Sequence, residues 1–184
     1  MEKNRLEAFS DGVLAIIITI MILELSLPLG GGLSDLLALT PTLLAYLLSF
    51  IFLAIYWVNH HLIFQMTETV NLGILWCNIA WLFALSFIPF GTAWVGRYPF
   101  ARAPISFYFA VMSLACVAFH LMYNLILCAR GEKKNFRLDA RNIISLLTYF
   151  LAAVFGWLLP VAAYIAVALV SCWWILPPKK RSEK

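Results

Sequence analysis

The spacing of apolar residues constrains the fold of this chain more than any other feature. A helix that crosses a bilayer needs about 20 mostly apolar residues. Of the 184 side chains, 64% are hydrophobic and only 12% are charged, too few for the surface of a water-soluble domain of this size. The sequence therefore predicts an all-α, polytopic membrane protein with six transmembrane helices in one domain over residues 1–184. The expected spans are about 6–27, 42–64, 72–90, 105–129, 142–159 and 161–176.

The links between these spans are expected to be short and to contain helix-breaking residues. We expect the first span to stop at Pro28. Ser34 and Asp35 are expected to cap a short lead-in to the second span. Residues 91–104 contain two prolines and are expected to form a loop, whereas Pro160 leaves room only for a tight hairpin between the last two spans.

The distribution of Lys and Arg predicts the orientation of the chain. Arg97 and Arg102 fall on one side of the membrane, and the other eleven of the 13 cations fall on the side of the termini. Cationic segments remain in the cytoplasm, so both termini are expected there. The net charge of +4 is then a topology signal beside anionic lipid, and nucleic-acid binding is not expected. The eleven cations are Lys3, Arg5, Arg130, Lys133, Lys134, Arg137, Arg141, Lys179, Lys180, Arg181 and Lys184.

The first span opens with charged and polar side chains. Arg5, Phe9, Ser10 and Asp11 stand at the head of a helix that is otherwise apolar. Charge at the edge of hydrocarbon is costly and is normally retained for a partner or a permeating species. His60 ends the second span at the same membrane face, so the side chains of Asp11 and His60 can meet.

Polar side chains inside the second and third spans supply further partners. Asn59 and His60 lie near the end of the second span, and Asn78 lies within the third. Because an unpartnered intramembrane His or Asn costs several kcal/mol, each of them implies a hydrogen bond. A proton relay through Asp11 and His60 is the alternative, but a structural pairing is favoured because no further acids line the later spans.

One stripe of the first span is aliphatic. At about 100° per residue, Ile16, Ile20 and Leu23 share one side of the helix, and Thr19 flanks them. Ser10 and Asp11, at the head of the helix, point away from this stripe, whereas the direction of Arg5 is left open. An aliphatic stripe is usually packing surface. The alternative is a set of aliphatic rings that narrow a pore and gate it by dewetting, and periodicity alone leaves both open.

The pattern Arg5-x-x-x-Phe9-Ser10-Asp11 resembles the signature of the lysosomal potassium channel family, transmembrane protein 175 and its bacterial relatives. This resemblance implies a cation channel that favours potassium and lacks the Thr-Val-Gly-Tyr-Gly filter of ordinary potassium channels. The present chain also lacks that filter.

The second and third spans extend the resemblance. Trp57-x-x-His60 followed by Phe64 is similar to the second span of the family. Asn78 and Pro89 fall where its third span has such residues. These matches cover about half of the chain, and the remainder agrees in hydropathy and in number of spans. Because bacterial members have one six-span unit and form homotetramers, the resemblance implies a homotetramer in a bacterial inner membrane.

The resemblance also assigns roles to residues. It implies that the first span lines the pore, with a constriction at Ile16, Ile20 and Leu23 and a hydroxyl layer tied to ion preference at Thr19. These are the residues that the helical wheel places on one stripe. It further implies a structural network formed by Arg5, Phe9, Ser10, Asp11, Trp57, His60 and Asn78.

The sequence as a whole predicts a potassium-favouring cation channel with a hydrophobic gate and no enzymatic step. No nucleophile cluster, metal-ligand set or acidic pair occurs at a common depth. No cofactor is expected, and no metal beyond permeating potassium and other monovalent cations. The alternative function is a proton-coupled secondary transporter that uses Asp11 and His60.

Overall fold

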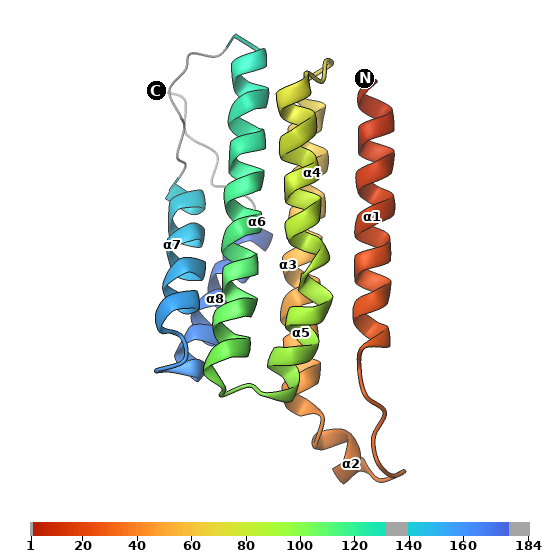
Figure 1. Ribbon diagram of the computed structural model, residues 1–184, viewed down its shortest axis with the longest axis vertical. Helices are drawn as coiled ribbons and strands as arrows, with labels where there is room; N and C mark the ends of the chain where they lie inside the picture. Colours follow the sequence, from red (N-terminus) through yellow and green to blue (C-terminus); the bar gives the residue numbers. More distant parts are fainter. Residues whose placement is uncertain (1, 132–139, 177–184) are drawn as a thin grey trace.

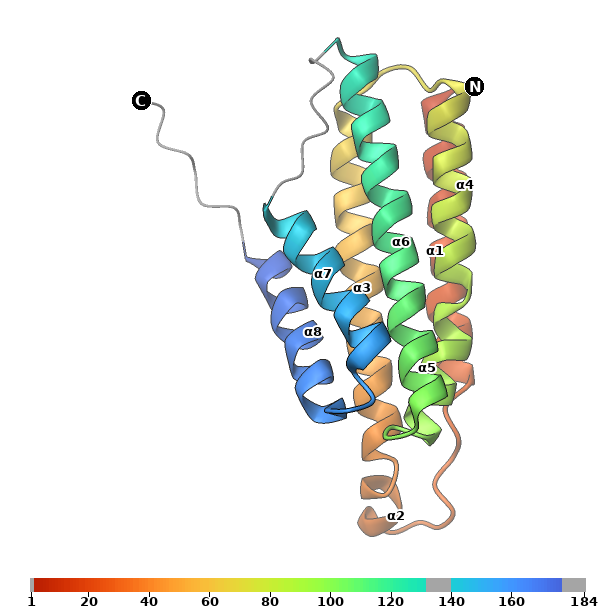
Figure 2. The same ribbon diagram turned by 60° about the vertical axis from the view of Figure 1, so that its left-hand side comes forward.

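The computed structural model describes residues 2–131 and 140–176, and every regular element in these ranges is a helix. The long helices run side by side along a common axis (Figures 1 and 2). Several of the cations expected to set the orientation lie outside the described residues: Lys133, Lys134, Arg137, Lys179, Lys180, Arg181 and Lys184.

Four described helical segments are long and apolar enough to cross a membrane. They are α1 (Lys3–Leu23), α3 (Thr40–Gln65), the segment Leu72–Arg97 that comprises α4 (Leu72–Ser86) and α5 (Ile88–Arg97), and α6 (Arg102–Ala129). The remaining apolar helices, α7 (Ala140–Phe155) and α8 (Pro160–Ile175), have 16 residues each. At 1.5 Å per residue each spans about 24 Å, less than the ~30 Å hydrocarbon core. The six apolar stretches are therefore all helical, but the last two are short.

The loop expected over residues 91–104 is wrong. Helix α5 continues the third span to Arg97, α6 begins at Arg102, and only residues 98–101 connect them. Pro89 lies in the first turn of α5, where a missing N–H breaks no helical hydrogen bond. Pro104 likewise lies in the first turn of α6, where no helical hydrogen bond is lost. Both prolines therefore lie at the start of a helix and do not end one. Arg97 lies in the last turn of α5, where its positive charge interacts favourably with the helix dipole.

The first span is also shorter than expected at its C-terminal end. Helix α1 ends at Leu23 instead of continuing to Pro28. The backbone then tightens, because the N–H of Leu25 donates to the carbonyl oxygen of Ile22 at 3.3 Å. The expected lead-in helix is present as α2 (Leu33–Leu37), where the Asp35 carboxylate accepts from the backbone N–H of Gly32 at 3.0 Å.

Helix α1 lies at the edge of the bundle. It packs against α3, α4 and α5, whereas α6 and α7 pack on the far side of those helices (Figure 1). The largest fully buried side chains include Trp81 of α4, Tyr108 of α6 and Phe52 of α3. One face of α1 is therefore fixed to the core, and no other described helix covers the opposite face.

Candidate ion pathway

Helix α1 presents a buried face and an exposed face. The buried face comprises Leu6, Ser10, Leu14, Ile17 and Met21, spaced three or four residues apart as one side of a helix requires. The other face carries Ile16, Ile20 and Leu23, which are 58%, 42% and 80% exposed. The structure thus separates the anchoring residues of α1 from the aliphatic stripe, as the helical wheel predicted.

A chain of buried hydrogen bonds joins α1 to α4 and α3. Ser10 Oγ donates to the carbonyl oxygen of Leu6 at 2.9 Å and accepts from Asn78 Nδ2 at 3.0 Å. Asn78 Oδ1 lies 2.9 Å from His60 Nε2. Because a carbonyl oxygen only accepts, His60 Nε2 must carry the proton. All three side chains are buried, so the network sets the rotation and depth of α1.

Aromatic rings hold the imidazole of His60 in place. The ring stacks on fully buried Trp81 with a centroid distance of 4.8 Å and an interplanar angle of 8°. Phe64 contacts the imidazole ring with its centroid at 4.6 Å. The His60 and Phe64 part of the Trp57-x-x-His60 pattern therefore has a packing explanation, because these two residues lie one turn apart on the buried side of α3.

Asp11 pairs with Trp57 instead of His60. The indole Nε1–H of Trp57 donates to Asp11 Oδ1 at 2.9 Å, on the exposed side of the α1–α3 contact. The expectation that Asp11 and His60 meet through a hydrogen bond is therefore not met among the described residues. The reason is geometric: Asp11 follows Ser10 by one residue, about 100° around the helix, and so points away from the buried network.

Arg5 and Phe9 belong neither to the Ser10–Asn78–His60 network nor to the Asp11–Trp57 pair. Phe9 is 55% exposed and Arg5 is also exposed, and neither belongs to the buried face of α1. Of the expected network, the structure brings together Ser10, Asn78 and His60, and separately Asp11 with Trp57.

The hydroxyl of Thr19 faces the same side as the aliphatic stripe. Thr19 Oγ1 donates to the carbonyl oxygen of Ile16 at 2.9 Å. This bond uses the only proton of the hydroxyl and leaves its lone pairs free to accept or to ligate a cation. A ring of such hydroxyls between aliphatic layers can replace part of the hydration shell of a monovalent ion.

A groove runs beside the stripe, between α1 and the junction of α4 and α5. Its volume is about 460 Å³, and Ile16 and Ile20 line it together with Pro89 and Phe90. Glu24, at the end of α1, lines the same groove. The described residues contain no group of three His, Cys, Asp or Glu side chains able to hold a metal ion. The chemistry along this face is hydrocarbon and hydroxyl, with the Glu24 carboxylate at the end of α1.

Sequence reasoning missed a second buried polar cluster. Ser49 Oγ lies 2.6 Å from Thr92 Oγ1 and 2.7 Å from Tyr108 Oη, and Thr92 donates to the carbonyl oxygen of Ile88 at 2.7 Å. With one proton on each hydroxyl, donation runs from Tyr108 to Ser49 to Thr92 to Ile88. Thr92 lay in the stretch expected to be a loop, which hid the cluster. The available signal was three hydroxyls in apolar stretches.

Comparisons with known proteins identify relatives of this chain. Residues 5–89 match the family described as endosomal/lysosomal potassium channel TMEM175. A protein named as a potassium channel from Chryseobacterium sp. (strain P1-3) is 41% identical over 184 residues, which is 98% of this chain and 96% of that protein. The chicken (Gallus gallus) endosomal/lysosomal proton channel TMEM175 is 27% identical over 91% of this chain but only 37% of its own length.

A solved structure has the same fold. It is the crystal structure of a lysosomal potassium-selective channel TMEM175 homolog from Chamaesiphon minutus, with a TM-score of 0.82 and 29% identity. The match covers 94% of this chain and 96% of the other. Together with the Chryseobacterium relative, it confirms the resemblance drawn from the signature of the first span. The chain belongs to the TMEM175 family, a family of ion channels and not of enzymes.

Proposed function

We propose that this chain is a potassium-favouring cation channel, assembled as a homotetramer around a pore lined by α1. The potassium-channel names of its bacterial relative and of its structural neighbour support the activity. Residues 1–184 would form one channel unit. The permeating ion is the substrate, and no cofactor takes part.

The single observation that carries the pore assignment is the exposed aliphatic stripe on a helix whose opposite face is hydrogen-bonded to the core. Ile16, Ile20 and Leu23 stay exposed among the residues that the structure describes. Four such stripes around an axis would cover one another and leave a narrow passage with hydrophobic layers. Thr19 would add a hydroxyl layer between them.

We further propose that the chain lies in the cell membrane, the inner membrane of a bacterium, with both termini in the cytoplasm. Among the described residues, Lys3, Arg5 and Arg130 lie at one end of the bundle, where α1 begins and α6 ends (Figure 1). Arg97 and Arg102 lie at the other end. The larger cationic side is expected to face the cytoplasm.

The alternative of a proton-coupled transporter has less support. A relay between Asp11 and His60 would need a continuous hydrogen-bonded path, whereas each of the two has its own partner in Trp57 and Asn78. Stoichiometric proton coupling in liposome flux, with turnover too slow for a pore, would favour the transporter.

Planar-bilayer recording under a potassium/sodium gradient tests the proposal. Leu23→Ala is expected to widen the constriction and to raise the single-channel conductance or to weaken the preference for potassium, since it removes a bulky side chain from the passage. Leu114→Ala is the matched control, because Leu114 is an exposed leucine of α6. Unchanged currents and selectivity in Leu23→Ala would count against the placement of the constriction.

A further inference from the structure

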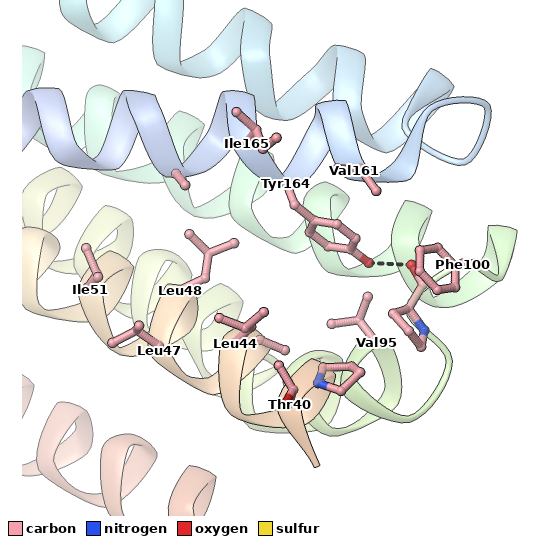
Figure 3. A pocket seen from close by; sticks show the side chains of 14 residues that line it. Thr40, Leu44, Leu47, Leu48, Ile51, Val95, Phe100, Val161, Tyr164 and Ile165 are labelled. Carbon is pink, nitrogen blue, oxygen red and sulfur yellow. Dashed lines mark hydrogen bonds between the residues drawn. The ribbon is translucent and has the colours of Figure 1, made fainter. Parts of the chain in front are cut away.

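The α7–α8 hairpin leaves an apolar groove between α8 and the first half of α3. The groove has a volume of about 470 Å³ (Figure 3). Its α3 wall runs from Thr40 to Ile51, about 16 Å at 1.5 Å per residue. Leu44 of α3 and Ile165 of α8 line opposite sides of it. Because both helices belong to the apolar part of the chain, the groove opens toward hydrocarbon.

The polar side chains that line this groove are already hydrogen-bonded. Tyr164 Oη donates to the carbonyl oxygen of Pro99 at 2.9 Å, a bond visible in Figure 3. Thr40 Oγ1 donates to the carbonyl oxygen of Leu37 at 2.6 Å. A buried water needs two to four polar partners. The hydroxyl protons of Tyr164 and Thr40 are already donated to carbonyl oxygens within the protein. The groove is therefore suited to a hydrocarbon chain and poorly suited to water.

Arg97 and Arg102 lie two residues to either side of Pro99 and Phe100, which line one end of the groove. The Arg102 guanidinium lies 4.6 Å from the ring centroid of Trp157, in the turn that leads into α8. The Arg97 guanidinium lies 5.7 Å from the ring centroid of Tyr98, its neighbour in the sequence. Both arginines are exposed, and the sequence has no Asp or Glu between residues 69 and 131. The acidic side chains at this end of the bundle are Glu24, which follows α1, and Asp35 of α2, whose carboxylate accepts from the backbone N–H of Gly32.

We propose that the groove binds one acyl chain of a membrane phospholipid, with the lipid phosphate beside Arg102. The apolar walls match the chain, and the cationic end matches the phosphate, which Arg binds through paired N–H donors. The cation–π contact with Trp157 restrains the Arg102 guanidinium, two residues beyond Phe100 of the groove lining. The site is separate from the stripe on α1, and its occupancy does not depend on conduction.

Native mass spectrometry of the purified full chain, titrated with palmitoyl-oleoyl phosphatidylglycerol, tests the site. Ala168→Trp places an indole in the groove and is expected to abolish the tightest lipid adduct. Leu169→Trp is the matched control, because Leu169 is exposed on the same helix and does not line the groove. It should bind lipid as the unmodified chain does. Ile165→Trp serves as a second blocking variant if Ala168→Trp does not fold.

The headgroup contact is tested by Arg102→Gln. The loss of one cation should weaken phosphatidylglycerol binding about fivefold and leave diacylglycerol, which has no phosphate, unaffected. Equal lipid binding by both blocking variants and the unmodified chain would overturn the proposal. Disulfide cross-linking between copies carrying Ile165→Cys would also overturn it, because a second subunit would then cover the groove.

Discussion

The two ends of α1 are held in different ways. Toward its start, Ser10 joins the buried Ser10–Asn78–His60 network through directional hydrogen bonds. Toward its end, Met21 is buried beside the Ser49–Thr92–Tyr108 cluster, with Thr92 Oγ1 at 3.7 Å from the sulfur. A thioether is a weak acceptor and an adaptable side chain, so packing dominates at this end.

This contrast bears on the proposed gate. Hydrogen bonds to an amide and an imidazole specify rotation and depth, whereas aliphatic and thioether contacts tolerate small shifts. The stripe residue most exposed in the structure, Leu23, lies at the end where packing dominates. We therefore expect the end of α1 that carries Leu23 to move more readily than the end that carries Ser10.

The largest expected effect comes from breaking the first network at its centre. Asn78→Leu leaves the Ser10 hydroxyl and the His60 N–H without this partner in a buried site, at about 1–3 kcal/mol for each group. The melting temperature of the detergent-solubilised protein, followed by fluorescence-detected size exclusion, should fall strongly. Ile79→Val is the control at an exposed neighbour. A melting temperature like that of the unmodified chain would show that the network does not hold α1.

The second cluster should respond according to the order of its donors. Ser49→Ala removes the hydroxyl between the other two and leaves the buried Tyr108 hydroxyl without its acceptor. Tyr108→Phe removes only the first donor of the series. We expect a loss of about 1–3 kcal/mol for Ser49→Ala and about 1 kcal/mol for Tyr108→Phe. The double variant should lose little more than Ser49→Ala alone, because both changes remove one chain of bonds. Additive losses in the same melting assay would disprove this donor order.

The smallest expected effect belongs to the exposed pairing. Trp57→Phe removes the donor to Asp11 while keeping an aromatic ring, and both residues remain reachable by polar solvent or headgroups. A loss of at most about 1 kcal/mol is expected. Phe9→Leu, on the exposed face of α1, provides the baseline for an aromatic change. A loss as large as that of Asn78→Leu would mean that Asp11 and Trp57 carry the anchoring instead.

The sequence identified much of the first network but not its pairing. The cost of an unpartnered His or Asn in hydrocarbon was enough to predict that His60 and Asn78 each have a bond. Which atoms meet depends on helix rotation and on neighbours distant in sequence, so the expected Asp11–His60 contact gave way to Asp11–Trp57 and His60–Asn78. The Ser49–Thr92–Tyr108 cluster was missed because α5 was taken for a loop.

The sequence by itself determined that this chain is helical, crosses a membrane and belongs to an ion-channel family, because run length, hydropathy and the signature of the first span are local properties. It also determined that Ile16, Ile20 and Leu23 share one side of α1, since helical periodicity requires it. Only the tertiary structure decided which side of α1 is buried, which polar atoms pair, and where α8 stands off α3 to leave a groove. Those outcomes depend on packing between segments far apart in the chain, which local patterns do not encode.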